Sequence, residues 1–181
     1  MKRWILIMGA VLLLGLGALG AGCGLSGGSD AISLEEYFQK IDEVQENNDA
    51  TFATQEAEAG EPSADATGEE LAQFLRDSVT SSAATLRASG AAADDIEPPD
   101  EVADAHADVV AAINDAADAL DVIADSLPDT LTLAGLEDPE APFFASEELN
   151  AAFDSLATAC NTLEDIAAAN DITVDLACDE V

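Results

Sequence analysis

Four stretches of this chain repeat one helical pattern, and this repetition most constrains the fold. In each stretch apolar residues recur at steps of three and four, which places them on one face of an α-helix. Four helices of this kind bury their apolar faces best against one another. We therefore expect an all-α fold, an antiparallel bundle of about four helices. The faces consist of Leu34, Tyr37, Phe38, Ile41 and Val44; Leu71, Phe74, Leu75, Val79 and Leu86; Val102, His106, Val109, Ile113, Leu120, Ile123 and Leu127; and Leu149, Phe153, Leu156, Cys160, Leu163 and Ile166.

Polar and acidic residues mark the expected helix starts. Residues 33–36 and 67–70 have the spacing of a capping box, and residues 146–148 offer a third polar cap. Residues 98–101 place two prolines and then two acids before the third helix. Each start thus puts two carboxylates near the positive end of a helix dipole.

Glycine and proline predict where the helices end. The first helix can continue toward Phe52, and we expect the second to stop near Gly90. The polar segments 59–68 and 90–99 are then loops. Pro128 ends the third helix.

A leader precedes these helices. Lys2 and Arg3 are followed by an uncharged, mostly apolar segment, and small residues then lead to Cys23. This order resembles the signal of bacterial-type exported lipoproteins, in which the cysteine receives fatty acyl chains such as palmitate. The resemblance implies removal of residues 1–22, a membrane anchor on Cys23 and a flexible tether over 23–30. The alternative is an uncleaved transmembrane anchor of about 20 residues.

Both alternatives export the acidic domain, residues 31–181. We therefore expect it at the extracytoplasmic face of the cell membrane, held there through the lipid anchor. A second resemblance covers residues 98–127 and 157–178. Its motifs, PPDEVADAH and ACNTLEDIA…DLAC, are similar to those of small exported lipoproteins from high-GC prokaryotes, and they imply a helical fold without a known activity.

The net charge limits the partners of this domain. The chain has 38 acidic residues against five lysines and arginines, a formal net charge of −33. Only Lys40, Arg76 and Arg87 follow Cys23. Such a surface repels nucleic acids and anionic lipid headgroups, so we expect no nucleic-acid binding.

The same charge opposes a compact fold at low ionic strength. Abundant Asp, Ala and Thr with little Lys resemble the composition of salt-adapted proteins, so we expect stability to rise with salt. Cation capture by carboxylates is the alternative. The sequence contains no D-x-D-x-D-G calcium loop, so we expect no specific metal site.

Two cysteines remain after Cys23. Cys160 and Cys178 form an even pair in an exported domain, and a disulfide between them is the economical interpretation. Residues 171–181 alternate apolar and polar side chains, which indicates a short extended arm. The disulfide would pin this arm to the fourth helix.

Three side chains are the candidates for binding. His106 lies on an apolar helix face without a second histidine, and Ala103 stands where a di-iron bundle needs a glutamate. A half-buried histidine bonded to a neighbouring helix is the favoured interpretation, with a ligand contact or a pH sensor as the alternative. Phe143 and Phe144 either plug the end of the bundle or form a patch for a partner.

The motifs of common enzymes are absent from the acidic domain. Residues 31–181 contain no G-x-S-x-G elbow, no C-x-x-C redox pair and no glycine-rich phosphate loop. We therefore expect a non-enzymatic binding or scaffold domain without a cofactor. Capture of a solute or cation in a bundle pocket for a membrane partner is the alternative, and a hydrolase has no support in the sequence.

Overall fold

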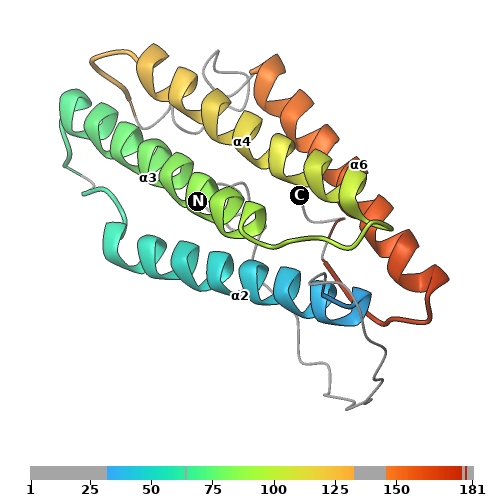
Figure 1. Ribbon diagram of the computed structural model, residues 1–181. Coiled ribbons are helices and arrows are strands. Elements are labelled where there is room, and N and C mark those ends of the chain that lie inside the picture. The colour runs from blue at the N-terminus through green and yellow to red at the C-terminus, as the bar shows by residue number, and fades with distance from the viewer. Residues whose placement is uncertain (1–31, 64, 133–145, 177, 179–181) are drawn as a thin grey trace.

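The computed structural model describes residues 32–63, 65–132, 146–176 and 178 (Figure 1). The leader, Cys23, the tether, Phe143 and Phe144 lie outside these described residues. Signal cleavage, the lipid anchor and the aromatic patch therefore stay predictions.

Four α-helices form the described part of the chain. They are α2 (Leu34–Ala59), α3 (Gly68–Asp94), α4 (Ala103–Ser126) and α6 (Glu147–Ala169). Each of them runs antiparallel to the helix before it, and the pairs α2 and α3, α3 and α4, and α4 and α6 pack together (Figure 1). The described residues contain no strand. The prediction of an all-α antiparallel bundle is confirmed.

Side-chain caps fix three of the four helix starts. The Ser33 hydroxyl accepts a hydrogen bond from the Glu36 amide at 3.1 Å, and Ser146 caps α6 in the same way. At α3 the box is complete, because the Thr67 amide also donates to the Glu70 carboxylate at 2.7 Å. These bonds from Thr67 lower the pKa of Glu70, since they stabilise the carboxylate.

The start of α4 differs from the prediction. Val102 is the N-cap residue, it has helical backbone angles and no side chain caps the helix. Asp100 and Glu101 lie in a turn before the helix, in which the Val102 amide donates to the Pro99 carbonyl. Val102 is only 1 % exposed, so burial of this side chain places the turn, whereas the local sequence pattern favoured an earlier start.

The end of α3 also differs. The helix continues through Gly90 to Asp94, so the predicted stop at Gly90 is wrong. Gly90 is buried against α4, where a β-carbon would lie 3.1 Å from Asn114 Oδ1 and 3.2 Å from Ile113 Cγ2. The glycine therefore serves the close approach of two helices, which a sequence pattern cannot distinguish from a helix end.

The core divides into two clusters along the bundle. The disulfide-end cluster joins the start of α2, the start of α4, the end of α6 and the arm; the far-end cluster joins the start of α3 to the end of α4. Between them α4 contributes buried alanines, which let the helices approach closely. The larger side chains of the first cluster are Tyr37, Phe38, Ile41, Ile96, Val102, Val109, Leu163 and Leu176, and those of the second are Leu71, Leu75, Val79, Ile123, Leu127 and Leu131.

Polar contacts attach the second half of α2 to α3. The Gln55 amide donates to the Thr85 hydroxyl at 2.6 Å, and the Ser89 hydroxyl donates to the Asn48 side-chain oxygen at 2.7 Å. Thr85 is buried, so these bonds also satisfy polar groups that packing removes from water.

A tight turn sends the chain back along α6. Asp171 adopts a left-handed φ of 57°, and the Ile172 amide donates to the Ala167 carbonyl at 2.9 Å. This is a Schellman arrangement, in which the position usually occupied by glycine holds an aspartate. The residues after it return along the helix as the predicted arm, with Leu176 buried.

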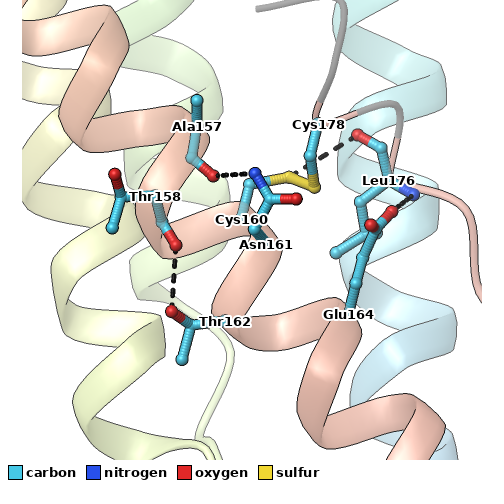
Figure 2. Close-up of a disulfide and its surroundings, with 8 residues drawn as sticks. All are labelled: Ala157, Thr158, Cys160, Asn161, Thr162, Glu164, Leu176 and Cys178. Carbon is cyan, nitrogen blue, oxygen red and sulfur yellow. Dashed lines mark hydrogen bonds between the residues drawn. A yellow bond between two sulfur atoms is a disulfide. The ribbon is translucent and has the colours of Figure 1, made fainter.

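The disulfide and one carboxylate hold this arm (Figure 2). Cys160 on α6 bonds to Cys178, with their Cα atoms 5.6 Å apart. One helical turn further along α6, the Glu164 carboxylate accepts a hydrogen bond from the Leu176 amide at 2.9 Å (Figure 2). The predicted disulfide-pinned arm is confirmed.

Candidate functional site

His106 lies inside the disulfide-end cluster. It is 6 % exposed, and its Nδ1 shares a hydrogen bond of 3.1 Å with the hydroxyl of Tyr37, which is fully buried on α2. The two rings also meet edge to face, with centroids 5.6 Å apart. The bond to a neighbouring helix that we favoured is thus present, while a ligand contact through His106 stays a prediction.

Burial shifts the titration of both groups. Loss of water contact raises the pKa of Tyr37, because the phenolate cannot be solvated. The same loss of solvation lowers the pKa of His106, and the carboxylate of Asp94 on α3 offsets part of this effect. Both shifts favour the neutral form of each side chain in the folded protein.

We expect His106 to reduce stability as the pH falls. Above about pH 6.5 the histidine is neutral in both the folded and the unfolded chain. Below that value the unfolded chain takes up the proton first, because burial lowers the pKa of His106 in the folded protein. Relative to a His106→Gln variant, the wild type should lose up to about 1 kcal/mol of unfolding free energy between about pH 7.5 and pH 5.5.

Chemical denaturation of both proteins at each pH measures this difference. Glutamine can still bond to Tyr37, so the comparison isolates the protonation of residue 106. A difference in unfolding free energy that is constant over this pH range would contradict the lowered pKa.

Two of the grooves on the described surface are shallow, and neither of these two includes His106. The α6–arm groove has a volume of about 570 Å³, and the α4–α6 groove has about 380 Å³. The first is lined by Glu164, Asp165, Ala168, Asp171, Ile172, Thr173 and Val174. The second is lined by Asp115, Asp118, Ala119 and Val122 of α4, and by Glu148, Ala151, Ala152 and Ser155 of α6.

The α4–α6 groove arises from matching stripes on two helices. Each helix contributes four residues at the spacing i, i+3, i+4 and i+7, which is one helical face. Ala119 and Ala152 are buried and form the floor. Val122 rises beside them and is 63 % exposed, the one large apolar side chain that is clearly exposed among the described residues.

One cation already neutralises part of this surface. Arg87 of α3 donates to Asp118 and to Asp121 of α4, each at 2.7 Å. These two bonds stabilise the guanidinium cation and raise the pKa of Arg87. The two aspartates are thus engaged from the α3 side, whereas Asp115 and Glu148 carry the charge at the ends of the groove.

The described ranges also bear on metal binding and membrane crossing. Within them, no group of three or more His, Cys, Asp or Glu residues is placed to hold a metal ion. None of the four described helices is long and apolar enough to cross a membrane.

The sequence predicted some of these residues and missed others. The Cys160–Cys178 bond and the placement of His106 on a buried face follow from pattern and composition. Tyr37 as the partner of His106 was missed, because the two residues are 69 positions apart and share no local motif. Val122 was missed as well, although a valine on the polar face of an amphipathic helix is a signal that could have found it.

Comparison of the chain with protein-family models, with curated proteins and with solved structures found no match.

Proposed function

We propose that this protein is a non-enzymatic docking domain, tethered through an acylated Cys23 at the extracytoplasmic face of the membrane. In this proposal its acidic helical surface binds a cationic protein partner. The leader supports the location, and the charge and the packed interior support the mode of binding.

The single observation that carries the proposal is the filled space around His106. Tyr37, Val102 and Leu163 of the same cluster are each at most 1 % exposed, and the described grooves lie elsewhere. A ligand would have to displace packed side chains to reach the only histidine. Recognition therefore falls to the surface.

The charge of that surface selects the partner. With a formal net charge of −33, the protein repels anionic lipids, nucleic acids and other acidic proteins. A basic partner is attracted over a range set by the screening length, about 8 Å at physiological salt. A tether at the membrane holds the domain where it can meet such a partner repeatedly.

A second candidate is capture of a small cationic solute in the α6–arm groove. Glu164, Asp165 and Asp171 supply carboxylates there, and Ile172 and Val174 supply apolar area. This combination of carboxylates and alkyl side chains suits a polyamine better than a bare metal ion.

The experiment that tests the proposed function uses the full protein isolated from membranes in neutral detergent. A fluorescent polylysine peptide of about 20 residues is the probe, polyglutamate is the control, and spermidine represents the second candidate. We expect polylysine to bind at about 50 mM salt and to lose affinity by at least about tenfold at about 500 mM salt, since screening weakens charge attraction. Polyglutamate should not bind.

Three results would count against parts of the proposal. Mass spectrometry of the N-terminal peptide should find an acylated Cys23 as the first residue, and an intact leader would remove the lipid anchor. Absence of polylysine binding at low salt would remove the docking function, and tighter binding of spermidine than of polylysine would favour solute capture.

A further inference from the structure

We propose that the α4–α6 groove is the docking site, and that its occupant is a cationic amphipathic helix that inserts an apolar side chain beside Val122. This inference rests on the proposed function and adds the place and the shape of the binding partner.

The shape of the groove fits a helix. Its two walls are rows of side chains from α4 and α6. These two helices are neighbours and run antiparallel (Figure 1). The alanine floor, Ala119 and Ala152, leaves the space that a third helix needs to approach within about 8–10 Å of the others. An apolar side chain of the partner would bury itself against this floor and against Val122.

The ends of the groove are charged, whereas its floor is apolar. Because α4 and α6 are antiparallel, Asp115 lies at one end of the groove and Glu148 at the other. Val122 lies seven positions after Asp115 on α4, at the end of the groove that Glu148 occupies, and seven positions correspond to a rise of about 10 Å. A partner helix with lysines or arginines about seven residues apart would therefore meet a carboxylate at each end.

Arg87 reduces the negative charge in the middle of this groove. It engages Asp118 and Asp121 with two short hydrogen bonds from the α3 side. The middle of α4 is thereby partly neutralised, so an apolar side chain meets less charge there than at the ends. Carboxylates at the two ends, alanines between them and Val122 beside the Glu148 end form a pattern that an evenly acidic surface does not have.

Other occupants fit less well. A second copy of this chain also carries a net charge of −33, so two copies repel one another. Nucleic acids and anionic lipid surfaces are repelled in the same way. A cationic helix satisfies both the charge of the ends and the apolar floor.

The experiment compares two designed peptides of about 18 residues with the same composition. The patterned peptide is helical, with leucine on one face and lysines seven residues apart at its borders; the scrambled peptide distributes these residues evenly around the helix. Binding to the full protein in neutral detergent is measured by fluorescence anisotropy at about 150 mM salt. We expect the patterned peptide to bind at least about tenfold more tightly.

Val122→Asp gives the sharpest comparison. It adds a negative charge, so general attraction alone predicts unchanged or tighter binding. Loss of the apolar contact predicts at least about tenfold weaker binding of the patterned peptide. Val122 is exposed, so we expect the variant to fold, and Val122→Ser is the second variant if its helical circular dichroism is reduced.

A matched pair of double variants separates site from net charge. Asp115→Asn with Glu148→Gln should weaken binding about fivefold, whereas Asp42→Asn with Glu46→Gln, on exposed positions of α2, should change it less than about twofold. Equal effects of the two double variants, or undiminished binding of the patterned peptide to Val122→Asp, would overturn the assignment of the docking site to the α4–α6 groove. The proposed docking function of the acidic surface would not be affected by either result. Failure of both peptides to bind at low salt would remove both proposals.

Discussion

Raising the salt concentration from about 10 mM to about 1 M should raise the melting temperature of this protein by about 10 °C. The screening length falls from about 30 Å to about 3 Å over this range, so repulsion between exposed carboxylates becomes weak. Screening stabilises the folded state more than the unfolded chain, because the charges of the folded state lie closer together. Thermal unfolding followed by circular dichroism measures the shift.

The structure shows where this repulsion acts. Acidic residues stand four positions apart on the exposed face of α4, as at Asp104 and Asp108, and on α2 at Asp42 and Glu46. Each like-charge pair of this kind costs about 0.2–0.5 kcal/mol. Several pairs and the longer-range repulsion together give about 3 kcal/mol, which corresponds to about 10 °C for a chain of this size.

The double variant Asp42→Asn with Glu46→Gln provides the control. It should melt above the wild type at low salt, because one repulsive pair is gone, and at the wild-type temperature in about 1 M salt. Potassium chloride is the salt of choice, since sulfate and phosphate stabilise proteins by exclusion from the surface. A wild-type melting temperature that does not change with potassium chloride would contradict the expectation.

Local features of the fold could be predicted because they depend on a few adjacent residues. Ser33, Thr67 and Ser146 cap their helices within three residues of themselves, and the structure contains all three caps. The apolar spacing needs only the period of the helix, and it correctly placed the buried faces. The disulfide followed from composition, since two cysteines remained after the leader.

The predictions were wrong where packing between residues far apart in the sequence determines where a helix begins or ends. Gly90 has the sequence signature of a helix end, yet it is a contact point for Ile113 across the α3 and α4 interface. The start of α4 moved because Val102 is drawn into the core. Helix-terminal rules consider the chain alone, whereas burial of one side chain can offset a weak local preference.

The candidate site was less predictable than the fold. A groove between α4 and α6 requires that the face of Asp115 and Val122 meets the face of Glu148, and the sequence does not say which polar faces become neighbours. The same limit applies to Tyr37 and His106, which meet across the disulfide-end cluster. Residues that act on ligands or partners are brought together by packing angles, and no periodic pattern encodes these.

Replacing Cys160 and Cys178 together by alanine should lower the unfolding free energy by about 3 kcal/mol, because the disulfide closes a separation of 18 residues in the unfolded chain. For a chain of this size, the loss corresponds to a melting temperature lower by about 10 °C. The arm would then be held by the Leu176 amide on Glu164 and by the burial of Leu176. Ile172 and Val174, which pack against the disulfide-end cluster, and the Ile172 amide bond to Ala167 add to these contacts.

Reduction distinguishes the bond itself from the small cavity that the alanines leave. Dithiothreitol should lower the melting temperature of the wild type to near that of the double variant, and it should not affect the variant. Hydrogen exchange should then speed up at Leu176 and at the end of α6, while the start of α3 in the far-end cluster keeps its protection. Equal melting temperatures of oxidised wild type, reduced wild type and variant would mean that packing of the arm, and not the covalent bond, closes this end of the bundle.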